Sequence, residues 1–462
     1  ARYPTEFGAD AKIGLTPSVT LDLTYNTDFA QVEVDEQRTN LTRFPVFFPE
    51  KRPFFLENAG VFSAGTPQQA DLFFSRRIGI DSLGRPVPIL GGGRVTGKVG
   101  SLTVGAMQLF SESVDGVQPA NSYSVGRISR ELGGRSRIGV IAVQRIAVDS
   151  AADRNRTFGI DGRIGAGEAW TVDWWAAKTE TPRLTGRDAA FTGRVAYQTR
   201  QWNNSFRFTQ LGESFNPELG FLSRSGYRNY DLSLFRTVEL NHKVLRYWQP
   251  HVNYRAFFGF DGKMQSEQYH FDFGETEFNS GGRIGPEVNV FGEGLLRPFR
   301  IAEGVVLPAG IYRYTSLGFD FSTNPSAPVS LLTRLDVGGF YNGRRTGGNS
   351  TLTLRKGSAL TTSLLVDYQD VRLDQGDFVR TLVGVRLGYF FNPRVFLQSL
   401  VQYSNQAKAF SANVRFGWLN TGGTGLFVVL NDAEQAEGLF DWTRPTTRSF
   451  VVKFTRQFGK AG

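Results

Sequence analysis

The last residues of the chain alternate between an apolar face and a mostly polar face. Phe450, Val452 and Phe454 fall on one side, and Lys453 and Thr455 fall on the other. The same period of two recurs along almost the whole chain, in segments of about ten residues separated by turns. This pattern is typical of strands that cross a membrane with one face toward lipid.

The composition argues for one large domain built from strands. The 462 residues include 53 Gly, 40 Phe and 15 Tyr but no Cys, and no Pro- or Ser-rich linker divides them. We therefore expect a single domain over residues 1–462. The mean hydropathy of -0.25 is low, as it would be if half of each strand faced a polar interior. No apolar run approaches the roughly 18 residues that a membrane helix needs, which excludes a helical membrane protein.

Turn residues divide the chain into a meander of antiparallel strands. Tight turns recur at roughly thirty-residue intervals, one hairpin to each, so we expect about 22 to 24 strands, in an even number. A β-sandwich would alternate too, but it would bury its apolar faces. We expect short turns on the periplasmic side and long loops outside. Tight turns are predicted at 99–101, 132–135, 165–168, 356–359, 392–393 and 421–424, and long connections at 111–122, 149–155, 211–225, 292–310 and 431–446.

One segment, from about residue 28 to 90, breaks the alternation. A segment of this length is too long for an idle loop in a compact domain. Barrels of more than about twenty strands enclose a wide lumen, and those known are plugged. We therefore predict an all-β fold, a transmembrane antiparallel β-barrel, in which the insertion at 28–90 occupies the lumen like a plug.

Several segments resemble those of a known family. The longest is 48–57, Phe-Pro-Glu-Lys-Arg-Pro-Phe-Phe-Leu-Glu, and the others are 26–35, 75–79, 216–221, 402–405 and 413–415. Through them the chain resembles bacterial outer-membrane proteins whose barrel-like domain, domain of unknown function 5916, usually follows a carbohydrate-binding family 9-like module. The resemblance implies an outer-membrane location and a barrel, but no chemistry. Because no such module precedes residue 1 in the given sequence, a link to glycans does not follow from the resemblance.

Eight arginines fall on the polar sides of their segments by alternation. Charge on the lipid face costs about 2 to 4 kcal/mol at the bilayer centre, so we predict that these side chains line the lumen. One interpretation is a passage that attracts anionic solutes. The other, which we favour, is that they pair with carboxylates of the same faces, such as Asp173 and Asp231, or with the plug. The eight are Arg163, Arg194, Arg207, Arg255, Arg313, Arg355, Arg386 and Arg415.

The predicted plug is itself rich in charge. One interpretation is a gate held by ion pairs to the arginine-rich wall, which opens when a ligand or partner competes for them. The other is a permanent stopper. Asp28, Glu33 and Asp35 offer oxygen ligands for calcium, but their spacing matches no known calcium loop, so we predict no metal site. The charged plug residues are Asp28, Glu33, Asp35, Glu50, Lys51, Arg52, Glu57, Arg76 and Arg77.

Catalysis finds little support in the sequence. The three histidines are His242, His251 and His270, and no zinc, phosphate-loop or nucleophile-elbow motif and no metal-ligand spacing surrounds them. We predict no catalytic residue, no cofactor and no enzymatic activity. Paired carboxylates in a lumen leave a barrel-embedded hydrolase as a third interpretation.

These features favour a gated or plugged conduit for a solute or polymer, anionic or glycan-like, across the outer membrane of a Gram-negative bacterium. The alternative is a closed structural barrel that anchors a periplasmic or surface module or an envelope complex. The expected partners are outer-membrane lipid and lipopolysaccharide, with a periplasmic or surface protein and a glycan ligand as further candidates. Nucleic acid is not expected, because the net charge of +9 is spread singly along the strands. The sequence starts at Ala1 without a signal peptide, so we interpret it as a processed product or a fragment.

Overall fold

The structure is a computed structural model that describes residues 7–26, 35–80, 87–420, 424–438 and 441–456. Within these ranges the chain is all-β, with 26 strands in one large sheet and two small sheets beside it. No helix in the described ranges is both long and apolar enough to cross a membrane.

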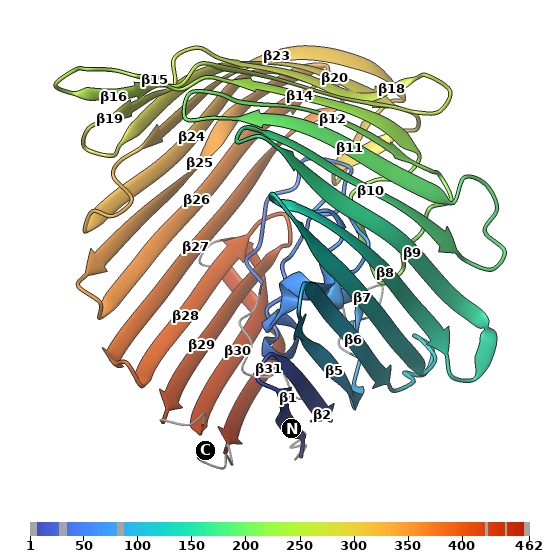
Figure 1. Cartoon of the computed structure of the whole chain (residues 1–462). Coiled ribbons are helices and arrows are strands. Elements are labelled where there is room, and N and C mark those ends of the chain that lie inside the picture. The colour runs from blue at the N-terminus through green and yellow to red at the C-terminus, as the bar shows by residue number, and fades with distance from the viewer. Residues whose placement is uncertain (1–6, 27–34, 81–86, 421–423, 439–440, 457–462) are drawn as a thin grey trace.

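The large sheet follows the chain as a meander in which neighbouring strands are antiparallel. Three short strands, β15 (Val238–Glu239), β16 (Leu245–Trp248) and β19 (Thr276–Phe278), extend β14, β17 and β18 and project at the upper left of Figure 1. The long strands are β1 (Ala9–Thr16), β2 (Val19–Tyr25), β5 (Ile89–Val99), β6 (Leu102–Ser111), β7 (Asn121–Gly133), β8 (Ser136–Ala147), β9 (Ser150–Ala166), β10 (Trp170–Glu180), β11 (Ala189–Gln198), β12 (Asn203–Leu211), β14 (Tyr227–Phe235), β17 (His251–Phe258), β18 (Met264–Asp272), β20 (Arg283–Leu295), β23 (Gly310–Ser322), β24 (Val329–Phe340), β25 (Gly343–Lys356), β26 (Leu360–Leu373), β27 (Gly376–Asn392), β28 (Val395–Ser404), β29 (Ala409–Leu419), β30 (Gly425–Gly438) and β31 (Asp441–Thr455).

Strands β1 and β31 form the two edges of this sheet within the described residues. β1 pairs only with β2, and β31 pairs only with β30. When the three short strands are counted with the strands they extend, 26 less 3 leaves 23. This number lies in the predicted range, but it is odd where we expected an even one. Because every step in the meander is antiparallel, a direct pair between β1 and β31 would be parallel.

The two faces of the sheet carry different side chains, as the alternation predicted. On β9, Phe158 and Ile160 are exposed on the convex face, whereas Thr157 and Asp161 are buried on the concave face. Far along the chain, Leu335 on β24 is likewise exposed on the convex face. The apolar rows are not covered by a second sheet in the described residues, so the fold is not a β-sandwich.

Two connections that we expected to be long loops are strands instead. Residues 149–155 belong largely to β9, which begins at Ser150, and residues 431–438 and 441–446 belong to the ends of β30 and β31. Residues 150–154 are small or charged, and residues 431–435 are mostly polar, so the alternation is lost although the strands remain paired. The end of the sheet that carries the long connections therefore also carries a tight hairpin between β8 and β9, and the predicted sorting of loops holds only in part.

The segment between β2 and β5 lies on the concave face of the curved sheet, where it is drawn in blue in Figure 1. We call its described residues, 35–80, the insertion. It contains α1 (Pro53–Leu56), η1 (Ala59–Phe62), β3 (Gly65–Thr66), β4 (Ala70–Asp71) and η2 (Ser75–Arg77). Pro53 starts α1, where its fixed φ suits the first turn and no amide hydrogen is needed. Strand β4 also pairs with β13 (Phe221–Leu222), and a separate hairpin of β21 (Phe299–Ala302) and β22 (Val305–Leu307) precedes β23.

Candidate functional site

The insertion packs most of its apolar side chains against one part of the concave face. We call this part, from β5 to β14, the covered wall. Leu72 and Ile78 are fully buried there, and the Nε1 of Trp175 on β10 donates to Thr66 Oγ1 at 2.9 Å. Burying each large apolar side chain contributes about 1.5 to 3 kcal/mol, so this contact holds the insertion firmly. The cluster joins Phe55, Phe62, Ala64, Ala70, Leu72 and Ile78 of the insertion to wall residues that include Met107, Leu109, Tyr123, Val125, Ile141, Val143, Trp175 and Leu211.

Glycines in the covered wall allow this close approach. A Cβ atom on Gly159 of β9 would lie 2.6 Å from Leu72 Cδ1, and one on Gly105 of β6 would lie 2.6 Å from Val61 Cγ1. Both distances are shorter than any stable contact between carbon atoms. The two glycines are therefore packing positions for the insertion.

A buried ion pair organises the 48–57 segment. The Glu50 carboxylate accepts hydrogen bonds from Arg52 Nε at 2.8 Å and from Ser75 Oγ at 2.7 Å. Arg52 in turn donates to the carbonyl oxygens of Ile78 and Ser75. Burial would raise the pKa of Glu50, but the hydrogen bonds and charge of Arg52, with Ser75, hold it below its usual value. These contacts join two of the segments that carry the family resemblance, 48–57 and 75–79.

Three other charged residues of the insertion pair with one another. Asp35 forms ion pairs with Arg76 and, at 3.8 Å, with Lys51. Asp35 is therefore already neutralised by cations, which disfavours the calcium interpretation. Asp28 and Glu33 lie outside the described residues.

A third resembling segment, 216–221, meets the insertion from the β12 to β14 connection. Arg77 Nε donates to the Gly220 carbonyl at 3.1 Å, and the Phe74 amide donates to the Leu219 carbonyl at 2.7 Å. The Phe221 ring stands edge-on to Phe47, with centroids 5.1 Å apart. Segments that are far apart in the sequence thus build one structure around the insertion.

Glu57 and α1 are held by the first strands of the sheet. Arg94 on β5 is 2% exposed and binds Asp22 with its Nη2 at 2.8 Å. Its Nη1 donates to the carbonyl oxygens of Phe54 and Glu57. Glu57 also forms an ion pair with Lys12 of β1. Arg94 thereby joins α1 to the wall.

The contacts of the insertion with the opposite side of the concave face are mostly polar. We call that side, from β17 to β29, the open wall. Leu41 joins a second buried apolar cluster there, at the end that carries β21 and β22. The polar contacts are Glu36 with Arg386, Gln37 with Gln402 and Ser411, Asn40 with Gln406, and Arg43 with Glu293.

Arg43 makes two polar contacts with the open wall. Its Nη1 lies 2.6 Å from Glu293 Oε2, and its Nη2 donates to the Gln265 carbonyl at 2.6 Å. Arg224 lies over the Phe44 ring nearby, and burial, followed by the charge of Arg43, lowers the pKa of Arg224 to about 10. Two cations therefore crowd the point where the insertion meets β18 and β20.

Seven of the eight predicted arginines lie on the concave face, and most have polar partners. Arg207 lies across from Asp231 in the strand register. These partners confirm the favoured interpretation of paired charges for Arg163, Arg194, Arg255 and Arg386. The contacts are Arg163 and Arg194 with Asp173, Arg255 with Asp231, Arg386 with Glu36, Arg355 with Ser330 and the Pro325 carbonyl, and Arg415 with Gln398.

The prediction for Arg313 was wrong. It shares the convex face of β23 with Ile311 and Leu317, which are 70% and 55% exposed, and it pairs with Glu267 at 3.6 Å. Arg313 lies three residues from the start of its strand. Near a strand end a long charged side chain can reach water from either face, so alternation no longer decides which face carries it.

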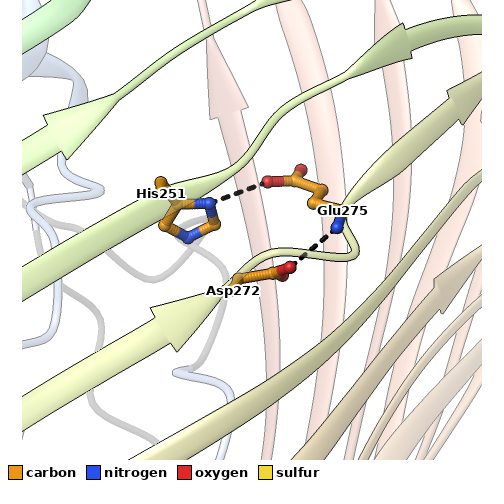
Figure 2. Close-up of side chains that lie close together, drawn as sticks. All are labelled: His251, Asp272 and Glu275. Carbon is orange, nitrogen blue, oxygen red and sulfur yellow. Dashed lines mark hydrogen bonds and ion pairs between the residues drawn. The ribbon is translucent and has the colours of Figure 1, made fainter.

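The open wall holds a polar cavity of about 860 Å³. His251 from β17, Asp272 from β18 and Glu275 from the β18 to β19 link point toward one another at its edge (Figure 2). The ligand atoms of these three side chains all lie within 4.8 Å of one another. Arg283 and Arg355 line the same cavity. This cluster is the one group of metal-ligating side chains found in the described residues.

The sequence prediction of no metal-ligand spacing missed this cluster. His251 and Asp272 are directly paired across the hairpin of β17 and β18, and Glu275 follows three residues later. The hairpin could have predicted this pair from the sequence, because a turn near residues 259–263 brings His251 opposite Asp272.

Comparison with known families finds a match to a domain of unknown function, DUF5916, over residues 2–88. The matched region covers β1, β2 and the insertion. No curated protein matches the chain significantly. The chain is thus similar to this domain in its first two strands and in the segment that lies on the concave face of the sheet.

Proposed function

We propose that this chain is a bacterial outer-membrane β-barrel that acts as a gated conduit, with the insertion as its plug. The observation that carries the proposal is the contrast between the faces of the sheet. The convex face exposes apolar side chains on strands throughout the chain, among them Phe206, Leu335 and Phe450, which are 47%, 51% and 68% exposed. A soluble monomer rarely exposes contiguous apolar surface beyond roughly 300 to 600 Å², and lipid is the solvent that would cover this face.

Closure of the sheet follows from the same environment. In lipid an unpaired strand edge leaves backbone groups without partners, each at a cost of several kcal/mol. The free edges of β1 and β31 would therefore pair, or an additional strand would lie between them. The odd strand count makes a direct pair parallel, whereas one additional strand would keep every pair antiparallel.

The passage would run between the insertion and the open wall. The open wall carries the cavity of about 860 Å³, whose lining includes the charged side chains of Arg283, Arg334 and Arg355. The insertion meets this wall mostly through hydrogen bonds and ion pairs, each of which contributes about 0.5 to 3 kcal/mol net. Such contacts can be exchanged for contacts with water or an anionic solute. The proposed cargo is an anionic or glycan-like solute or polymer, and no catalytic step is part of the proposal.

A closed anchoring barrel remains the alternative, and one observation favours it. The apolar cluster around Leu72 and the buried Glu50 and Arg52 pair tie the insertion to the covered wall. If the whole insertion stays in place, the barrel would hold a periplasmic or surface module without conducting.

Reversible cross-linking in planar lipid bilayers separates the two functions. The chain has no cysteine, so the pair Asn40→Cys and Gln406→Cys, at a polar contact of the open wall, is the only thiol pair in the variant. A short thiol-reactive cross-linker with a reducible bond should suppress channel openings. Reducing that bond should restore them. The matched control places the cysteines at Arg163 and Asp173, away from the insertion. Silent bilayers before and after cleavage would favour the anchor, and a protein that stays soluble without detergent would overturn the barrel itself.

A further inference from the structure

The cluster at the edge of the open-wall cavity is built to hold a positive charge. Asn289 Nδ2 donates to Glu287 Oε1 at 2.8 Å, and because a carboxylate only accepts, this contact fixes the orientation of the Asn289 amide. Its Oδ1 therefore faces His270 Nδ1, at 3.0 Å. His270 Nδ1 must carry a hydrogen.

The second histidine follows from the first. His270 Nε2 lies 2.8 Å from His251 Nε2. In a neutral His270 the Nε2 atom is an acceptor, so His251 donates its Nε2 hydrogen to it. A neutral His251 then has a lone pair on Nδ1. That lone pair faces two oxygens, Glu275 Oε2 at 3.3 Å and the Gln249 carbonyl at 3.2 Å. This arrangement is repulsive unless a cation, either a proton or a metal ion, lies at Nδ1.

We propose that this cation is a divalent transition-metal ion, such as Zn²⁺, bound by His251 Nδ1, Glu275 Oε2 and Asp272. Two atoms that each lie about 2.0 to 2.1 Å from one ion, at angles between a right angle and the tetrahedral value, are about 2.8 to 3.4 Å apart. The His251 and Glu275 atoms already have this separation. Imidazole nitrogen with carboxylate oxygen suits Zn²⁺ better than Mg²⁺ or Ca²⁺, which prefer oxygen ligands alone.

The surrounding contacts orient these ligands as in metal sites. One oxygen of each carboxylate is engaged elsewhere: Asp272 Oδ1 accepts from the amides of Gly274 and Glu275 at 2.9 and 2.7 Å, and Glu275 Oε1 pairs with Arg283 at 3.0 Å. The second oxygen is left for an ion. Metal-bound histidines donate their other N–H to a partner, and His270 is that partner here. Asp272 is 3% exposed, so its charge is costly without a counterion.

The cavity gives the ion a function beyond structure. Three protein ligands leave positions open, and these positions face the cavity that Arg355 also lines. An anionic solute in the cavity could therefore complete the coordination shell. The metal site is independent of whether the insertion opens, so it can exist in an anchoring barrel as well as in a conduit.

Metal titration of the untagged, EDTA-treated protein in detergent tests the proposal, with Zn²⁺ alone as the probe. Calorimetry should give one Zn²⁺ site per chain and no comparable site for Mg²⁺ or Ca²⁺. Asp272→Asn and Glu275→Gln should each abolish it, and His270→Gln, which removes the partner of the ligating histidine, should weaken binding about 10- to 100-fold. The control is His242→Gln, at an exposed histidine in the turn before β16, which should bind like the parent.

A second measurement keeps the test decisive if a variant folds poorly. The chain contains only three histidines, so their ring-nitrogen NMR signals can be assigned from the His242 and His270 variants. Adding Zn²⁺ should move the His251 Nδ1 signal from the protonated range to the range of a metal-bound nitrogen. The proposal is overturned if Zn²⁺ leaves His251 doubly protonated, since the cation is then a proton, or if the Asp272 variant binds Zn²⁺ as tightly as the parent.

Discussion

The covered wall and the open wall hold the same insertion by different forces. At the covered wall, Phe55, Phe62 and Leu72 join a continuous apolar cluster. At the open wall most contacts join polar or charged groups, such as Glu36 with Arg386. Apolar burial is lost in full when two surfaces separate, whereas polar groups regain partners in water. The difference teaches that the open wall is where the insertion would release first.

In the proposed gate, the insertion would stay fixed at the covered wall and detach at the open wall. Arg94 and the Glu50 and Arg52 pair stiffen the part of the insertion that lies on the covered wall. Residues 35–43 reach across to the open wall. A movement confined to these residues would open a path along the open wall while the apolar cluster stays intact. The predictions below test the two walls separately.

The largest expected effect is at the covered wall. Leu72 is fully buried, and Leu72→Ala removes apolar contacts and leaves a cavity, which typically costs about 2 to 5 kcal/mol. We expect the free energy of unfolding in detergent to fall by that amount, as measured by denaturant titration followed by circular dichroism. Leu56→Ala, at a position that is 50% exposed, is the control and should change stability by less than roughly 0.5 kcal/mol. Equal losses in both variants would show that the cluster does not anchor the insertion.

The sequence predicted the faces of the strands better than the contacts of the insertion. Period-two alternation placed strand faces correctly over most of the sheet, because each strand sees the same two environments along its length. It failed for Arg313, where the strand nears its end. The position of the insertion followed from its length and from the size of the sheet, without any knowledge of its contacts.

The pairing of charges was harder to predict. One interpretation of the plug charges was a gate held by ion pairs to the arginine wall, yet Glu50 pairs with Arg52 and Asp35 with Arg76, because these partners lie within the same folded segment and are closer than the strands of the wall. Among the described residues of the insertion, Glu36 alone forms an ion pair with one of the predicted wall arginines, Arg386. Such partners depend on how the irregular segment folds, and periodicity carries no information about that.

A smaller effect should come from Asp71 of β4, at the boundary between the insertion and β13. Burial raises the pKa of Asp71 to about 6, in spite of a hydrogen bond from the Gln68 amide. The folded pKa lies above the ordinary value of 3.8. Below pH 3.8 Asp71 is protonated in both the folded and the unfolded protein, so it does not lower the free energy of unfolding. Between pH 3.8 and pH 6 this loss of stability grows, and above pH 6 it is complete. At about 1.4 kcal/mol for each pKa unit, Asp71→Asn should stabilise the protein by at most about 3 kcal/mol at pH 7.5, and by nothing near pH 3.5.

The measurement is the difference in unfolding free energy between variant and parent at several pH values, so that other titrating groups cancel. Asp261→Asn is the matched control, because Asp261 lies in an exposed turn where the amide and side chain of Lys263 lower its pKa. The control should show no gain at pH 7.5. A stabilisation by Asp71→Asn that is the same at both ends of the pH range would show that burial of the charge is not its cause.

The smallest change in stability should come from the open wall, and it should have the largest consequence for gating. Arg386 and Glu36 are partly exposed, and such a pair contributes about 0 to 1 kcal/mol. Arg386→Gln should therefore leave unfolding almost unchanged. If the closed state alone contains this pair, losing about 1 kcal/mol raises the equilibrium between open and closed states about fivefold. Arg163→Gln removes a wall arginine whose partner is Asp173 rather than the insertion, and it should leave the open probability in planar bilayers as in the parent. An equal rise of the open probability in both variants would mean that the charge of the wall alone sets conduction. The polar contacts between the insertion and the open wall would then not hold the closed state.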